Sequence, residues 1–218
     1  MQLTFPPVEA YQPRWSPDGT QIVFMDVGPN HSWRIGLLPA AGGTPEWLTQ
    51  DGYDPTWSPD GKSIVFGLSC DGDSGAIYRL DLETRKVSLI PQSEKSCSPR
   101  LSPDGHYLSA LTLGGTEMRL LDTATNQWSS LIAGGQLGFN EWSPDGKYVY
   151  VRGIRDGAAE VVRVKIKDRV AEHVLSLKEI PQPSDIFTWW IGPTPDGGLL
   201  LMRDRSVQEI YALDLLFR

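Results

Sequence analysis

The stretch "RWSPDGTQIVF" at residues 14–24 returns four more times, in recognisable form, along this chain of 218 residues. The other copies are "TWSPDGKSIVF" at 56–66, "RLSPDGHYLSA" at 100–110, "EWSPDGKYVYV" at 141–151 and "GPTPDGGLLLM" at 192–202. Their Pro-Asp-Gly cores lie 42, 44, 41 and 51 residues apart. Periods of this size indicate a solenoid, a propeller or a repeat array.

Each period contains several short runs of strand-forming residues. One run follows every Pro-Asp-Gly, and a second comes later, as in "WRIGLL" and "AIYRLDL". A third follows in four of the five repeats, and the residues before the motif supply a fourth. The runs are bounded by Gly, Pro, Asp and Asn, which is typical of strands. Four strands in about 40 residues predict a β-propeller blade, with strands a to d ordered outward from the axis.

The repeated Ser-Pro-Asp-Gly predicts the turn between strands a and b. Proline fixes the first corner of a type I turn, aspartate can accept bonds from local backbone N–H groups, and glycine accepts the positive φ that follows. The Trp or Leu before the motif is expected to point between blades. The repetition is therefore structural in the first instance.

We expect a single all-β domain over residues 1–218, a five-bladed propeller of four-stranded antiparallel blades. The predicted blades are 11–49, 53–90, 97–132, 138–176 and 187–215 plus 2–5. The last repeat lacks strand d, whereas "QLTF" at the start matches internal d strands. Because open sheet edges are avoided, residues 2–5 are expected to pair with 208–215 and close the ring. The alternative is part of a six- or seven-bladed propeller, completed by further sequence or by a second copy.

The motif "PRWSPDG-x-x-I-V-F" with a downstream "IYRLDL" resembles the WD40-like repeat of TolB-type propellers. The start "QLTFPPVEAYQPRWSPDG" and the late "QEIYALD" are similar to propellers attached to bacterial winged-helix or kinase regulators. The resemblance covers the whole chain and implies a rigid platform that holds a protein, peptide or small ligand. It implies fold more than function, because propellers host many unrelated roles.

Composition narrows the classes of partner. A net charge of −7 disfavours a nucleic-acid surface, which needs clustered Lys and Arg. No apolar run approaches the ~20 residues of a membrane helix, and no signal peptide is visible. We therefore expect a monomer without a membrane or nucleic-acid partner, in the cytoplasm, or in the periplasm if the chain is an excised domain.

Catalytic and metal motifs are weak. "GDSGA" at 72–76 is similar to a serine-protease nucleophile loop, but Ser74 would need a His base, and the three His fall in different blades. "DGDSG" lacks the alternating oxygen ligands and distal Glu of a calcium loop. We expect no cofactor and no metal. A non-enzymatic binding scaffold, such as the sensor or docking domain of a regulator, is preferred over a lyase or the gating propeller of a hydrolase.

Cys70 is expected just after strand b of the second blade, and Cys97 just before strand a of the third. These loop types open on the same face, so a disulfide is geometrically conceivable. Two free thiols in a reducing cytoplasm are the favoured interpretation.

The binding face is expected opposite the Pro-Asp-Gly turns, where the loops vary most. Aligning the repeats gives two columns at the entry to strand a, with two arginines just below, and aromatic and Arg side chains favour binding. The alternative is that these rings only pack between blades. The predicted ligand-binding residues are Tyr11, Gln12, Arg14, Tyr53, Asp54, Arg100, Phe139, Trp189 and Trp190.

Overall fold

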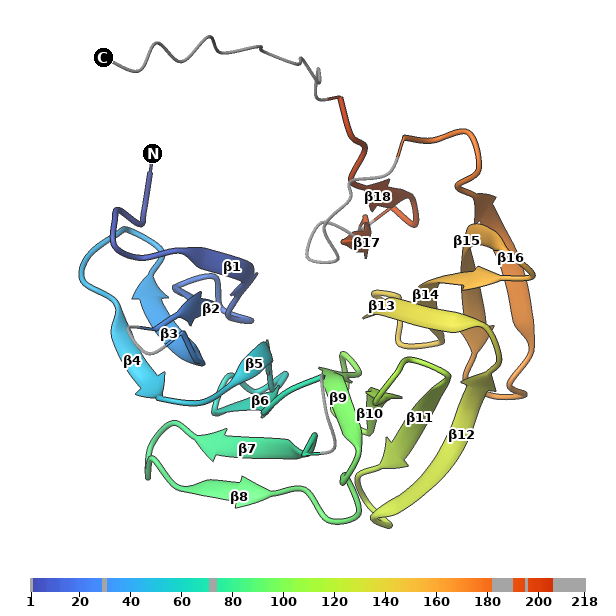
Figure 1. Ribbon diagram of the computed structural model, residues 1–218. Coiled ribbons are helices and arrows are strands. Elements are labelled where there is room, and N and C mark those ends of the chain that lie inside the picture. Colours follow the sequence, from blue (N-terminus) through green and yellow to red (C-terminus); the bar gives the residue numbers. More distant parts are fainter. Residues whose placement is uncertain (1, 29–30, 71–73, 182–189, 195, 206–218) are drawn as a thin grey trace, which may run out of the picture.

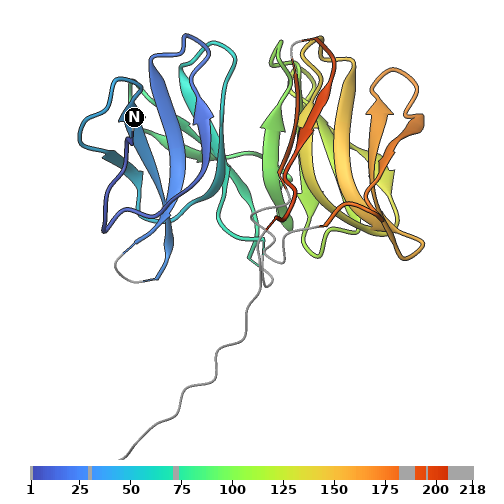
Figure 2. The same cartoon turned by 90° about the horizontal axis from the view of Figure 1, so that it is seen from above.

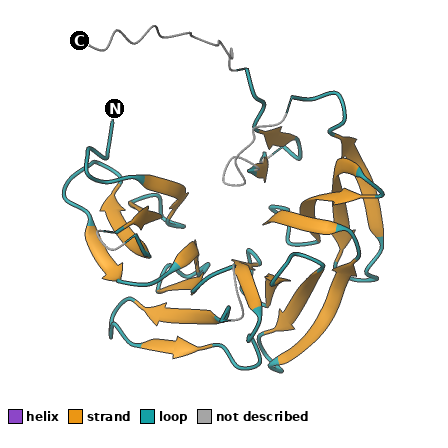
Figure 3. Ribbon diagram, viewed as in Figure 1, coloured by secondary structure: helices purple, strands orange, loops and turns teal. Residues whose placement is uncertain are grey.

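The computed structural model describes residues 2–28, 31–70, 74–181, 190–194 and 196–205. Every regular element in these ranges is a β-strand, as the colouring of Figure 3 shows. Within these ranges no helix is long and apolar enough to cross a membrane. The all-β prediction is confirmed.

Four antiparallel sheets of four strands follow one another around a common axis (Figure 1). In each sheet the first strand lies nearest the axis, and the order along the chain is the order in space. The strands are β1 (Ala10–Trp15), β2 (Gln21–Val27), β3 (Trp33–Pro39), β4 (Glu46–Thr49), β5 (Tyr53–Trp57), β6 (Ser63–Gly67), β7 (Ile77–Asp81), β8 (Val87–Leu89), β9 (Ser96–Leu101), β10 (Tyr107–Thr112), β11 (Glu117–Asp122), β12 (Gln127–Ala133), β13 (Gln136–Trp142), β14 (Tyr148–Arg155), β15 (Ala158–Lys165) and β16 (Ala171–Ser176). The prediction of four-stranded propeller blades is confirmed for these four. Figure 2 shows the blades from the side.

The core consists of apolar layers between neighbouring blades. We number the blades along the chain: blade one is β1–β4, blade two β5–β8, blade three β9–β12 and blade four β13–β16. Alternate residues of β6 point to opposite sides of blade two, so Ile64 and Phe66 pack on blade one, whereas Val65 packs on blade three. Similar layers join blades three and four, and blade four and the last sheet. A blade therefore buries both of its faces only when it has a neighbour on each side.

The Ser-Pro-Asp-Gly turns are held by local hydrogen bonds. In the first, Ser16 Oγ donates to Asp18 Oδ1 at 2.6 Å, Gly19 N donates to Ser16 O, and the φ of Gly19 is 70°. The amide of Thr20 also donates to Asp18 Oδ1. The serine–aspartate bond recurs at 2.5–2.7 Å in the next three turns. Threonine replaces serine in the last turn, where Thr194 donates to Asp196.

Two of the tryptophans that precede these turns, Trp57 and Trp142, tie their blade to the preceding one. Trp57 Nε1 donates to Arg14 O at 3.0 Å, and Trp142 Nε1 donates to Arg100 O at 3.0 Å. Both indoles are buried between blades, as predicted. Trp15 occupies the same motif position, but it is 61% exposed.

The fifth sheet requires a correction. The described residues contain four complete blades rather than five, followed by a two-stranded sheet of β17 (Ile191–Pro193) and β18 (Leu199–Leu201). Residues 2–5 form no strand, and their predicted partner, 208–215, lies outside the described residues. In the described part of the chain, the ring of strands is open between β1 and the β17–β18 sheet (Figure 1). A β-strand forms only where another strand offers an edge for pairing. The similarity of "QLTF" to internal strands shows that the residues suit a strand, but it does not show that such an edge lies beside them.

Candidate functional site

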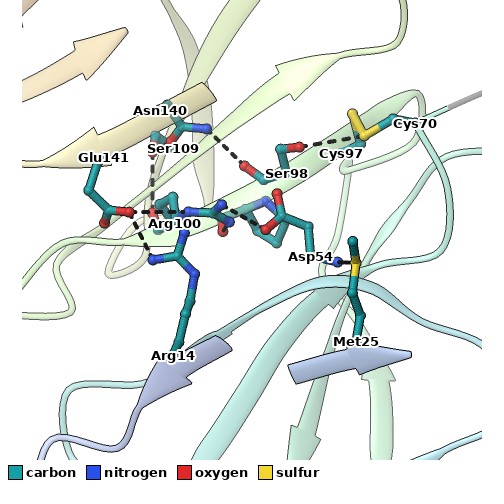
Figure 4. A network of polar contacts seen from close by, with 11 residues as sticks. Arg14, Met25, Asp54, Cys70, Cys97, Ser98, Arg100, Ser109, Asn140 and Glu141 are labelled. Carbon is teal, nitrogen blue, oxygen red and sulfur yellow. Dashed lines mark hydrogen bonds and ion pairs between the residues drawn. A yellow bond between two sulfur atoms is a disulfide. The ribbon is translucent and has the colours of Figure 1, made fainter. Parts of the chain in front are cut away.

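The innermost strands of four blades bring four charged side chains together near the axis (Figure 4). They are Arg14 from β1, Asp54 from β5, Arg100 from β9 and Glu141 from β13. Innermost strands are the ones that line the axis of a propeller. Residues separated by 127 positions, Arg14 and Glu141, are therefore in contact.

A bulge in each innermost strand sets the direction of the side chains at this end. The ladders of β1, β5 and β9 shift register there, and Gln12, Asp54 and Ser98 adopt φ of 49°, 50° and 50°. Each of the three precedes a proline, which has no N–H to give to a ladder and is found in sheets at edges or bulges. A bulge re-aims the side chains around it, and of these three residues Asp54 contributes its charge to the cluster at the axis.

Arg100 is the most deeply placed charge of the cluster, with 1% of its side chain exposed. Its NH2 group donates to Asp54 Oδ1 at 2.7 Å, and its NH1 group donates to Pro99 O at 2.7 Å. Glu141 Oε2 lies 3.7 Å from its Nε. Burial lowers the pKa of Arg100, and the charge of Arg14 lowers it further, against the opposing attraction of Asp54 and Glu141. A guanidinium stays protonated under these conditions, so the site holds a fixed positive charge.

Arg14 shares the carboxylate of Glu141 with Arg100. Arg14 NH1 donates to Glu141 Oε2 at 2.8 Å. Burial alone would lower the pKa of Arg14, but the attraction of Glu141 and Asp54, with the hydrogen bond to Glu141, outweighs burial and raises it. Two cations thus face two anions, and the cluster is close to neutral as a whole.

Neutral polar groups extend the cluster into blades three and four. Asn140 Nδ2 donates to Ser98 O at 3.1 Å, and Asn140 Oδ1 accepts from Ser109 Oγ at 2.9 Å. The ring of Phe139 lies 5.9 Å from the Arg100 guanidinium carbon, within the range of a cation–π contact.

A pocket of about 220 Å³ opens beside this network on the face opposite the Pro-Asp-Gly turns. Its wall includes the loop between β10 and β11 and the entries to β5, β9 and β13. We call it the mouth pocket. It is lined by Gln12, Tyr53, Asp54, Cys70, Cys97, Ser98, Arg100, Leu111, Thr112, Gly114, Gly115, Gln136, Leu137, Gly138, Phe139 and Asn140. Mixed apolar and polar walls of this kind are typical of ligand sites, although 220 Å³ is small for one.

Wider hollows lie on the open side of the ring. One of about 450 Å³ is lined by Gln12, Pro13, Arg14, Trp15, Trp190 and Met202. Another, of about 380 Å³, brings Trp15 and Gly192 to the same hollow. The mouth pocket is therefore not the largest concavity, but its lining comes from four successive blades.

Comparison with known families gives a match to the TolB beta propeller domain over residues 5–185. The chain belongs to the TolB beta propeller family. Comparison with curated proteins gives no match. Among solved structures, one assigned to TolB from Agrobacterium tumefaciens has a TM-score of 0.67 and 22% identity, covering 75% of this chain and 64% of that one. TolB from Acinetobacter baumannii has a TM-score of 0.67 and 24% identity, covering 80% and 44%.

The same fold occurs in enzymes. A puromycin hydrolase structure has a TM-score of 0.62 and 15% identity, covering 91% of this chain and 34% of that one. At these identities the likeness shows the fold alone. The chain spans 64% and 44% of the two TolB chains that it matches, so it corresponds to part of each.

The propeller brings five of the nine predicted residues into the mouth pocket: Gln12, Tyr53, Asp54, Arg100 and Phe139. Arg14 and Trp190 line the hollows on the open side instead. Tyr11 packs edge-to-face on Trp33 of its own blade, with ring centroids 5.3 Å apart. Trp189 lies outside the described residues. Whether any of these residues binds a ligand stays a prediction.

Sequence reasoning missed Glu141 and Asn140. Glu141 stands directly before its Trp-Ser-Pro-Asp-Gly, in the alignment column of Arg14 and Arg100. A glutamate in the same repeat position as two arginines was the signal that could have predicted an ion pair there. Asn140 follows a bulge without proline, so nothing in the local sequence marks it.

The two cysteines form a disulfide in this TolB propeller, with Cα atoms 5.3 Å apart. The favoured interpretation, two free thiols, is wrong. Neighbouring blades bring the end of one strand b close to the start of the next strand a, which places both residues within bridging distance.

Catalytic groups do not converge in the described ranges. His106 lies 3.4 Å from Asp122, and His173 lies 3.8 Å from Glu160, both at exposed positions. Ser74 is exposed, and the preceding residues 71–73 lie outside the described ranges. Across the described chain, no group of three or more His, Cys, Asp or Glu side chains is placed to hold a metal ion.

Proposed function

We propose that this TolB propeller is a non-enzymatic binding module that holds a protein, peptide or small ligand in the mouth pocket. The observation that carries the proposal is the pocket itself, which gathers aromatic, Arg and amide side chains from separate blades at one end of the axis. The buried ion pairs fix these side chains before any ligand arrives, and preorganisation favours binding. By resemblance, the module serves as the sensor or docking domain of a larger regulator.

Gln12 and Phe139 give the sharpest variants for a test. Gln12 Oε1 is buried without a hydrogen-bond partner among the described residues, so Gln12→Ala removes a ligand contact at little structural cost. Phe139→Ala removes the ring beside Arg100. Lys86→Ala, on the exposed turn between β7 and β8 at the opposite face, is the matched control.

The experiment is selection of peptides from a random phage-displayed library on the folded protein, followed by titration of the selected peptides. Loss of a binding hot spot costs more than 1 kcal/mol, so the two pocket variants should weaken binding by at least about fivefold. Lys86→Ala should leave it unchanged. Peptides that bind all four proteins equally would place recognition elsewhere and contradict the proposal.

A second candidate function is the gating propeller of a hydrolase. It is favoured by the puromycin hydrolase likeness, in which this chain covers 34% of the other protein. Such an enzyme carries its nucleophile on a Gly-x-Ser-x-Gly elbow, and this chain has no such sequence. The complete reading frame distinguishes the candidates, because the second requires that elbow in another part of the protein.

We also propose that the ring closes with five blades. The support is the position of Trp15 in the repeat. Its counterparts Trp57 and Trp142 donate to backbone carbonyls of the previous blade, those of Arg14 and Arg100. Each of these carbonyls belongs to the residue just before the motif Trp or Leu of that blade. In the fifth sheet the corresponding residue is Gly192, which lines one hollow with Trp15. Closure would bury Trp15 and the apolar side chains beside it.

Trp15→Ala tests closure. In a closed ring it should destabilise the protein by about 3–5 kcal/mol, as removal of a buried Trp does. The N-terminal part of the closure is tested by deleting residues 1–5, which should lower the melting temperature. If neither change alters the melting temperature or the monomer fraction, five-bladed closure is wrong.

A further inference from the structure

The Cys70–Cys97 disulfide lies in the wall of the mouth pocket (Figure 4). Cys97 belongs to β9 of blade three, whereas Cys70 follows β6 of blade two. Both residues line the pocket. The bond is therefore a covalent link between two blades at the proposed binding site, and not only a clamp within one sheet.

The two cysteines differ in exposure. Cys97 is 3% exposed and is held in the ladder opposite Leu111. Cys70 keeps part of its surface exposed, and its Sγ lies 3.5 Å from the hydroxyl oxygen of Ser98. Thiol–disulfide exchange depends on which sulfur an incoming thiolate can reach. Cys70, as the more exposed residue of the pair, is the expected point of attack.

We propose that Cys70–Cys97 is a thiol–disulfide exchange site whose redox state sets the affinity of the mouth pocket. A thiolate of a dithiol reductant attacks Cys70 Sγ and forms a mixed disulfide. The Cys70–Cys97 bond breaks, and its electron pair leaves on Cys97 Sγ, which takes a proton. The second thiolate of the reductant then attacks its partner sulfur and releases Cys70, so the reductant ends as a disulfide and both cysteines as thiols.

The effect on the pocket follows from what remains after reduction. Cys97 stays fixed by its strand, and Ser98 O still accepts the hydrogen bond of Asn140. Cys70 loses its covalent bond to blade three. A hydrogen bond from Lys95 N to Gly75 O, at 2.7 Å, still connects the two blades nearby. A ligand must then order that wall as it binds, and this ordering reduces affinity.

The chemical part of the proposal needs no ligand. The oxidised protein is incubated, without denaturant, with a thioredoxin whose resolving cysteine is replaced by serine, and the mixed disulfide is mapped by peptide mass spectrometry. The adduct is expected on Cys70. An adduct on Cys97, or no adduct on a protein that dithiothreitol also fails to reduce under native conditions, would overturn the exchange site.

The affinity part rests on the proposed function and uses the peptides selected for it. Reduction with dithiothreitol should weaken their binding by about tenfold, within the usual range of coupling between sites. The Cys70→Ser/Cys97→Ser double variant should match the reduced protein and ignore the reductant, with circular dichroism confirming that both remain folded. Binding that changes less than twofold on reduction refutes redox control. Failure to select any pocket-dependent peptide refutes the binding function but leaves the exchange site to the mass measurement.

Discussion

Asp54→Asn isolates the buried ion pair at the axis. The substitution keeps the size of the side chain and removes the charge that faces Arg100 at 2.7 Å. Because the side chains of Arg100 and Asp54 are 1% and 3% exposed, water cannot replace the lost partner. Removing one member of a buried pair typically costs about 3–5 kcal/mol.

The geometry places the expected cost at the lower end of this range. Glu141 Oε2 remains 3.7 Å from Arg100 Nε and compensates in part, although it already binds Arg14. We expect a loss of about 3 kcal/mol in the free energy of unfolding. For a chain of this length that corresponds to a fall of about 6–12 °C in melting temperature.

Urea unfolding and thermal melting followed by circular dichroism measure this loss. Glu46→Gln is the matched control, because its pair with Arg85 has the same 2.7 Å separation but is about half exposed. Exposed pairs contribute 1 kcal/mol or less. The double variant Arg100→Met/Asp54→Asn should recover part of the stability, because it removes both charges and keeps at position 54 a side chain that tolerates its positive φ. A loss under about 1 kcal/mol for Asp54→Asn would refute the buried-pair argument.

Three further changes have defined outcomes. Replacing Cys70 and Cys97 by serine frees a closed loop with a sequence separation of 27, and it should lower the unfolding free energy by about 3.6 kcal/mol in urea titrations; an unchanged midpoint would argue against the bond. The hydrogen bond from the serine of its turn holds the pKa of Asp145 at about 2. The ionised carboxylate therefore stabilises the fold above its ordinary pKa of 3.8, and this stabilisation is lost as pH falls toward 2. Asp145→Asn should reduce the pH dependence of the urea midpoint between about pH 5 and 2, and the same pH dependence in both proteins would contradict this. Gly114→Ala places a Cβ in open space at φ +80° and should destabilise the protein by about 1–2 kcal/mol. Gly115→Ala also has a positive φ, +64°, but its Cβ would lie 2.4 Å from a backbone oxygen, so it should cost at least twice as much. Similar melting temperatures for the two variants would show that the pocket wall shifts to accept the added Cβ.

The turns and strands of this protein could be predicted from sequence because their chemistry is local. Ser16 and Asp18 bond within one turn, and Gly19 supplies the positive φ that follows. The alternation of Ile64, Val65 and Phe66 is likewise a property of neighbouring residues, and it assigns each side chain to one face of a blade. The family resemblance and the propeller followed from five repetitions of such local signals.

The candidate site was predictable only in part. Tyr53, Asp54, Arg100 and Phe139 were found from their columns, since the entry to an innermost strand is a repeated position. The sequence could not pair Arg100 with Asp54, 46 positions away, or show that Glu141 serves two arginines. Those contacts depend on which blades face one another across the axis.

The tertiary structure also decided features that identical motifs leave open. Trp15 and Trp57 follow the same pattern, yet among the described residues Trp57 donates to a carbonyl of the preceding blade, whereas Trp15 is 61% exposed. The disulfide depends on the distance between neighbouring blades, and the extent of the fifth sheet depends on the edges available for pairing. Local sequence fixes how one blade folds, whereas the arrangement of blades around the axis fixes which side chains meet and how far the ring closes.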